Sequence, residues 1–168
     1  MALNLLRAGH ALTVFNRDAS RCEPLQAAGA RVANSPGSAA AAAEVLLVCV
    51  SNDDAVEAVL LGAPAAEFST DLTESWTPAV EGLQAGSLVI DCSTISPATS
   101  RRLAAALAER GIQYLDAPVT GGTEGARAGT LSVLVGGDSQ DLERARPLLQ
   151  LLGSRITHFG PVGAGQEA

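Results

Sequence analysis

The sequence contains no lysine. All eleven of its basic residues are arginine, eighteen residues are acidic, and the formal net charge is −7. A chain with this charge balance has no basic surface for the phosphates of a nucleic acid, and an acidic membrane surface would repel it. We therefore expect no nucleic-acid or membrane partner, and look for a small-molecule ligand.

Cysteine is also scarce. Cys22, Cys49 and Cys92 lie far apart and form no Cys-x-x-Cys or Cys/His pair with the spacing of zinc ligands. Neither a disulfide framework nor a zinc site is predicted. Three buried free thiols in a reducing compartment are expected instead.

Long apolar runs are missing as well. No run approaches the ~18–20 apolar residues that span a bilayer, and no charged start followed by a short apolar core marks a secretion signal. We therefore expect a soluble, cytoplasmic protein.

What the chain does contain is an alternation of short apolar segments with helical ones. Hydrophobic residues make up 47% and charged residues 17% of the 168 residues, which suits one packed domain. Strands are predicted at 11–15, near 32, and at 44–50, 87–91, 114–116, 131–135 and 156–159. Helices are predicted at 1–8, 19–28, from 35 onward, and at 52–61, 97–110 and 138–152. This order is typical of an α/β protein with a doubly wound, mostly parallel sheet of the Rossmann type.

Two further stretches carry expectations of their own. The run from Glu44 to Val50 is almost wholly apolar, which predicts a strand buried on both faces. Residues Gly62 to Thr77 are polar and contain proline, and we interpret them as an irregular surface insertion in which Trp76 packs locally.

The segment from Asp116 to Leu131 is the most informative part of the sequence. It follows a predicted strand, passes through Thr120, Gly121 and Gly122, and enters a helix of small residues. Glycine lets the main chain approach a ligand, and successive N–H groups at a helix start form a concavity suited to a carboxylate or phosphate. The alternative is an ordinary glycine-rich turn.

Three segments at predicted strand ends resemble one family. They are Asp-Cys-Ser-Thr-Ile-Ser-Pro at 91–97, the glycine-rich segment at 116–131, and Gly-Pro-Val-Gly-Ala-Gly-Gln at 160–166. In this order and spacing they resemble the β-hydroxyacid dehydrogenases, the group that contains 3-hydroxyisobutyrate dehydrogenase and tartronate semialdehyde reductase. The resemblance implies an NAD(P)-binding Rossmann domain, an all-helical domain after it, and a homo-oligomer at full length. It also implies hydride transfer between a small 3-hydroxy acid and its aldehyde acid.

The sequence departs from this family pattern at both ends. The family's first strand and its Gly-x-Gly-x-Met-Gly phosphate-binding turn would precede Met1, and its catalytic lysine would follow Ala168. We therefore expect residues 1–168 to be an incomplete NAD(P)-binding domain, without the helical domain and inactive alone, in which two inner strand edges stay unpaired. The alternative is a compact variant in which a neighbouring chain or a rearranged strand fills the gap.

Matched residue by residue, the resemblance assigns two sets of candidate site residues. Those that would bind the substrate carboxylate are Ser93, Thr120, Gly121 and Gly122. Those that would contact the cofactor are Asn16, Arg17, Val50, Ser51 and Thr94. Ser93, Thr94 and the three residues at 120–122 also suit a structural role in a strand-to-helix turn.

Arg17 bears on the choice of cofactor. With Asn16 it replaces the acidic residue that would hydrogen-bond a ribose 2′-hydroxyl. An arginine there can pair with a 2′-phosphate, which favours NADP(H) over NAD(H). A solvated surface arginine is the alternative.

Other polar residues suit structural roles. His10 and His158 have no carboxylate nearby in sequence, and the acidic pair at 53–54 is explained by the dipole of a helix start, so no metal site is expected. Asp91 and Asp116 suit turn hydrogen bonds better than acid–base work.

Two other functions stay open: a non-catalytic nucleotide-binding or interaction module, and an imine reductase, which shares the architecture.

Overall fold

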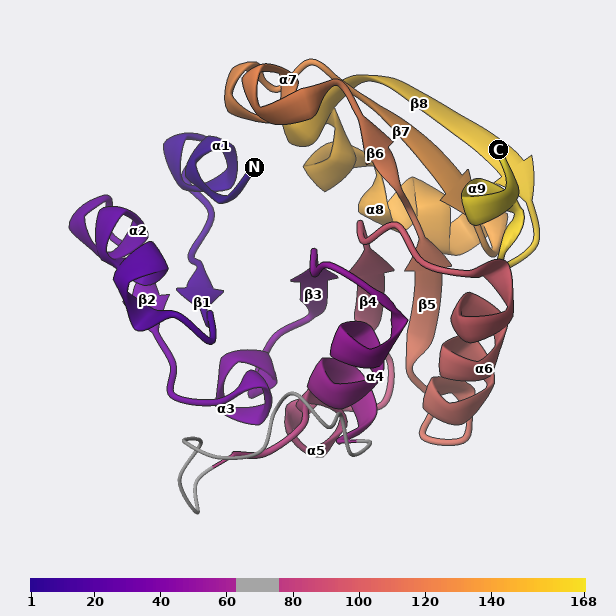
Figure 1. Ribbon diagram of the computed structural model, residues 1–168, viewed down its shortest axis with the longest axis horizontal. Coiled ribbons are helices and arrows are strands. Elements are labelled where there is room, and N and C mark those ends of the chain that lie inside the picture. The colour runs from indigo at the N-terminus through magenta and orange to yellow at the C-terminus, as the bar shows by residue number, and fades with distance from the viewer. Residues whose placement is uncertain (63–75) are drawn as a thin grey trace.

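The strands of the computed structural model, which describes residues 1–62 and 76–168, form two sheets (Figure 1). β1 (Thr13–Val14) and β2 (Arg31–Val32) pair in parallel as a separate two-stranded sheet. The larger sheet has the order β3-β4-β5-β7-β6, and β8 also pairs with β7. Its strands are β3 (Val45–Val48), β4 (Leu88–Asp91), β5 (Gln113–Asp116), β6 (Val119–Thr120), β7 (Leu131–Gly136) and β8 (Gly153–Gly160).

The larger sheet is mostly parallel, as predicted. β3 with β4, β4 with β5, and β7 with β8 are parallel pairs, whereas β7 is antiparallel to both β5 and β6. The predicted α/β class with a doubly wound sheet is therefore confirmed.

The described residues form nine α-helices, some of which cover the two faces of this sheet. They are α1 (Ala2–Arg7), α2 (Glu23–Ala27), α3 (Pro36–Ala40), α4 (Asp53–Leu61), α5 (Ala79–Gly82), α6 (Pro97–Ala108), α7 (Gly122–Ala128), α8 (Ser139–Leu152) and α9 (Ala164–Glu167), with a 3₁₀ turn at Ala19–Cys22. Four of these helices and the 3₁₀ turn begin at a residue whose side chain accepts a main-chain N–H. These side chains belong to Asp18, Ser35, Asn52, Ser96 and Asp138.

The alternation of side chains along β4 explains the layers. Val89 packs into a cluster with residues of α4, α5 and α6, while Leu88 and Ile90 pack into a second cluster with Leu5 of α1 and residues of α8. Successive side chains of a strand point to opposite faces, so one strand supplies both cores. All three are fully buried, and each such side chain contributes roughly 1.5–3 kcal/mol.

Some elements differ from the sequence-based expectation. β6 and α5 were not predicted, and β8 begins three residues before the predicted strand. Most of the predicted insertion at 62–77 lies outside the described residues. The ring of Trp76, which was expected to pack within this insertion, meets Phe15 edge-on, with 5.4 Å between ring centroids.

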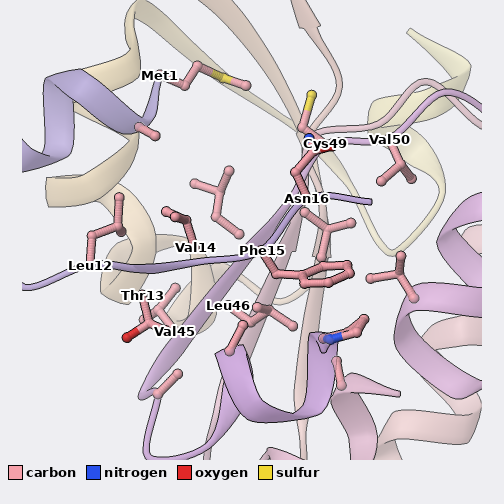
Figure 2. Close-up of a pocket in the computed structure, with 18 of the residues that line it drawn as sticks. Met1, Leu12, Thr13, Val14, Phe15, Asn16, Val45, Leu46, Cys49 and Val50 are labelled. Carbon is pink, nitrogen blue, oxygen red and sulfur yellow. The ribbon is translucent and has the colours of Figure 1, made fainter. Parts of the chain in front are cut away.

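A cavity separates the two sheets. β1 pairs with β2 and β3 with β4, and in the part of the chain that is described no pairing joins β1 to β3. A cavity of about 1600 Å³ lies between them, lined by Leu12, Val14 and Phe15 on one side and by Val45 and Leu46 on the other (Figure 2). The expected pair of unpaired inner edges is therefore present.

Main-chain hydrogen bonds show which groups face this cavity. Arg31 N donates to Leu12 O and Ala33 N to Val14 O, while Leu88 N donates to Glu44 O. Because main-chain groups alternate in direction along a strand, those of Thr13, Val45 and Leu47 are directed toward the cavity.

The cavity also explains two corrections. Val45, Leu46 and Leu47 are only partly buried, whereas a strand buried on both faces was expected. Cys49, at the end of β3 in Figure 2, is exposed, although Cys22 and Cys92 are buried as predicted. Both differences follow from the open edge of β3.

Candidate cofactor and substrate site

Four of the five predicted cofactor residues line the same cavity. Asn16 and Arg17 follow β1, and Val50 and Ser51 follow β3, so all four lie beyond the carboxyl ends of the two strands on either side of the cavity. Figure 2 shows Asn16 and Val50 at the same end of the cavity. In open α/β sheets this edge is where nucleotides bind.

The turn after β1 is shaped by its own side chains. Asn16 Oδ1 accepts the N–H of Asp18 at 2.9 Å, and Asp18 Oδ1 accepts the N–H of Ser20 at 3.1 Å. These bonds fix the turn that carries Arg17, which is exposed. A guanidinium placed there is accessible to a ligand in the cavity.

The start of α4 is tied to the start of α6. Asp53 accepts the N–H and hydroxyl of Ser96, the latter at 2.6 Å, and the hydroxyl of Thr99 at 2.6 Å. Partial burial raises the pKa of Asp53, but these hydrogen bonds outweigh it and hold the pKa below its ordinary value. The acidic pair at 53–54 was interpreted only as a dipole effect, and the structure adds this bridge between two helices.

Ser93 joins the ends of β3 and β4. Its Oγ accepts the N–H of Val50 at 2.9 Å, and its own N–H donates to Asp91 Oδ1 at 2.9 Å. The hydroxyl of Tyr114 donates to the other Asp91 oxygen at 2.9 Å. Burial raises the pKa of Asp91 above its ordinary value, and the Ser93 and Tyr114 hydrogen bonds oppose that shift. The predicted turn role of Asp91 is confirmed.

Ser93 itself is buried, with 1% of its surface exposed, whereas Thr94 is exposed. Neither residue lines the large cavity. The structure thus brings Ser93 into contact with the predicted cofactor residue Val50 and presents Thr94 beside it at the surface.

The glycine-rich loop joins the edge of the sheet to a helix. β6 follows β5, pairs with β7 and leads into α7, which lies at the top of the view in Figure 1. Thr120, Gly121 and Gly122 are exposed, and the two glycines have φ of 130° and 65°. Such positive φ values favour glycine, and a Cβ on Gly121 would also lie 3.2 Å from Leu131 Cδ2. No hydrogen bond found among the described residues joins this loop to Ser93.

Asp116 has a role that the sequence did not indicate. It is fully buried, and its carboxylate accepts the N–H of Gly163 at 2.7 Å and that of Gln166 at 3.0 Å. These partners are far along the chain, so the expected turn hydrogen bond is wrong. The carboxylate instead holds the start of α9 against the end of β5.

Gln166 is the second residue that sequence reasoning missed. Its Nε2 donates to Ser93 O at 2.8 Å, and its Oε1 accepts the N–H of Ile95 at 3.2 Å. The signal available was its place at the end of the Gly-Pro-Val-Gly-Ala-Gly-Gln segment, which was used for the resemblance alone.

The described ranges, 1–62 and 76–168, hold no group of three His, Cys, Asp or Glu side chains arranged to ligate a metal ion. Within the same ranges no helix combines the length and apolarity needed to cross a bilayer.

The fold and the cavity at the carboxyl ends of its strands define a dinucleotide-binding domain. Residues 1–160 match the family described as the NAD binding domain of 6-phosphogluconate dehydrogenase, and the chain belongs to that family. The NAD-dependent L-serine dehydrogenase of Pseudomonas aeruginosa is 44% identical over all of this chain and 52% of its own length.

Solved structures of similar proteins have the same fold as this chain. The 3-hydroxyisobutyrate dehydrogenase of Mycobacterium tuberculosis, solved with L-serine, superposes with a TM-score of 0.84 at 34% identity, over 99% of this chain and 52% of that one. Psf3, solved with NADP⁺ and 2-OPP, gives a TM-score of 0.86 at 32% identity, over 99% of this chain and 54% of that one. The chain therefore spans about half the length of the relatives that it matches.

Proposed function

We propose that this chain is the cofactor-binding part of an NADP(H)-preferring β-hydroxyacid dehydrogenase that interconverts a small 3-hydroxy acid and its aldehyde acid. The observation that carries this proposal is the cavity flanked by Asn16, Arg17, Val50 and Ser51, in a chain of the NAD-binding family. The named relatives include one NAD-dependent enzyme and one NADP⁺ complex, so the preference for NADP(H) rests on Arg17.

The residues present fit the adenosine half of the cofactor. The exposed Arg17 would pair with the 2′-phosphate, and Asn16 and Ser51 border the same cavity. Thr94 would lie at the nicotinamide ribose. When bound, the nicotinamide supplies or accepts the hydride.

Thr120, Gly121 and Gly122 would hold the substrate carboxylate through their exposed main chain, and Ser93 is the fourth residue proposed to bind the substrate. The two glycines support this assignment, because they carry no side chain that would keep a carboxylate from the N–H groups of the loop, and their positive φ values suit glycine. By holding the carboxylate, these N–H groups would orient the substrate for hydride transfer.

Fluorescence titration with NADPH tests cofactor binding. Trp76 is the only tryptophan in the sequence and lines the cavity, so its emission should fall saturably as NADPH fills that cavity. NADH should require a higher concentration for the same effect. Binding of neither nucleotide would contradict the proposal.

Turnover by the complete gene product then separates the alternatives. NADP⁺-dependent oxidation of 3-hydroxyisobutyrate or L-serine would support the dehydrogenase. Reduction of a cyclic imine alone would favour an imine reductase. Cofactor binding without any turnover would favour a non-catalytic nucleotide-binding module.

A further inference from the structure

The side-chain amide of Gln166 brackets one exposed residue. It bonds the main chain on both sides of Thr94, with Ser93 O as acceptor at 2.8 Å and the N–H of Ile95 as donor at 3.2 Å. A carboxamide both donates and accepts, so it satisfies the two peptide groups at once. No other standard side chain of this length offers the same pair of bonds.

Gln166 is itself held firmly. Its N–H donates to Asp116, and the Asp116 carboxylate also accepts the N–H of Gly163. Gly165 packs so closely that a Cβ there would lie 2.4 Å from Leu134 O and 2.8 Å from Asp116 Oδ2. The backbone of α9 is therefore fixed against β5 and β7, and the Gln166 side chain transmits that position to the turn after β4.

The same turn is attached to the cofactor cavity from its other side. Ser93 Oγ accepts the N–H of Val50, which lines the cavity. Thr94 thus sits on a turn that is anchored at Val50, at Asp91 and at Gln166. Removing the Gln166 side chain would therefore release the main chain at Ser93 O and Ile95 N, while the bonds to Val50 and Asp91 would remain.

We propose that Gln166 is a positioning residue, which sets the main chain at Thr94 for the nicotinamide-ribose half of the cofactor. This inference rests on the proposed function, since it needs a nicotinamide cofactor in the adjoining cavity. It assigns Gln166 no direct part in the reaction. Its effect is confined to one half of the dinucleotide, because the residues proposed for the adenosine half lie on the turns after β1 and β3.

The test compares two ligands on the 168-residue chain and its variants. NADP⁺ needs both halves of the site, whereas adenosine 2′,5′-bisphosphate occupies only the adenosine half. Gln166→Met keeps the side-chain length and removes both hydrogen bonds, and Gln166→Glu keeps only the acceptor. Gln140→Met is the matched control, because Gln140 is exposed on α8 and no hydrogen bond of its side chain is found among the described residues.

We expect Gln166→Met to raise the Kd for NADP⁺ about tenfold, as the loss of two hydrogen bonds predicts, while the Kd for the bisphosphate changes less than about twofold. Amide hydrogen exchange at Ile95 should become faster in the same variant. If Gln166→Met does not fold, the two Kd values are compared for Gln166→Glu instead. Gln140→Met should change neither Kd.

Two results would overturn the inference in distinguishable ways. The positioning role is wrong, and the proposed function stands, if the unaltered chain binds NADP⁺ and the Gln166 variants bind it equally well. The same conclusion follows if the variants lose affinity for NADP⁺ and for the bisphosphate together. If the unaltered chain binds no nicotinamide nucleotide, both fail.

Discussion

Asp116→Asn probes how α9 is held at the end of the sheet. The Asp116 carboxylate is fully buried and accepts two main-chain N–H groups, from Gly163 at 2.7 Å and from Gln166 at 3.0 Å. Asparagine has nearly the same volume but only one accepting oxygen, so its NH₂ group would face one of these donors. The change therefore removes one charge-assisted bond and leaves one buried N–H group without an acceptor.

The expected cost follows from those two terms. A hydrogen bond to a charged group contributes roughly 1.5–3 kcal/mol, and an unsatisfied buried donor costs about 1–3 kcal/mol. Because α9 is short and lies at the end of the sheet, we expect the lower end of the sum, about 2.5–3 kcal/mol. In a chain of 168 residues this lowers Tm by roughly 5–12 °C.

Differential scanning calorimetry measures the loss, and amide hydrogen exchange at Gly163 and Gln166 locates it. Asp138→Asn is the control, since Asp138 caps α8 at the surface and asparagine caps a helix about as well as aspartate. Equal Tm values for Asp116→Asn and the unaltered chain, with unchanged exchange at α9, would refute the reasoning.

Three further predictions concern single side chains. Arg17→Glu should raise the Kd for NADPH at least about tenfold and leave that for NADH within about twofold, because only NADPH has a 2′-phosphate; equal losses for both would contradict the assignment. A thiol reagent should modify Cys49 first and reach Cys22 and Cys92 only on unfolding, since Cys49 is exposed and the other two thiols are buried; mass spectrometry of the labelled peptides checks this order. Asp53 has a pKa below its usual 3.8, so its stabilisation is present above pH 3.8 and is lost as the pH falls through the lowered value. Urea unfolding should therefore show a stability gap between the unaltered chain and Asp53→Asn at pH 6 that closes on acidification; a constant gap would count against it.

Elements with strong local signals were predictable from the sequence. The helix from 97 has a capping serine and a proline at its start, and the structure begins α6 there with Ser96 accepting the N–H of Thr99. The strands predicted at 87–91 and 114–116 are β4 (Leu88–Asp91) and β5 (Gln113–Asp116) of the structure, because short apolar segments between predicted helices mark strands. Local propensity and burial pointed to the same answer in both cases.

The features that were missed depend on distant partners. β6 contains only Val119 and Thr120 and exists because β7 lies beside it, which no local pattern encodes. The contact of Trp76 with Phe15 also joins residues far apart in the sequence. Such pairings are fixed by packing rather than by propensity.

The residues of the candidate site show the same contrast between local sequence signals and distant partners. The glycine-rich loop was found from its glycines, whereas the cofactor residues on the turns after β1 and β3 were assigned from the family resemblance. The roles of Asp116 and Gln166 could not be found, since their partners lie 47 to 73 positions away along the chain. Motifs identified the turns, and only the fold showed what connects them.

Chemical-shift mapping with NADPH tests the central claim most directly, that the carboxyl ends of β1 and β3 hold a nicotinamide dinucleotide. We predict saturable shifts at the amides of Asn16, Arg17, Ser51 and Thr94, with little change along the exposed residues of α8. Shifts confined to other surfaces, or no shifts at millimolar NADPH in the folded chain, would contradict the account.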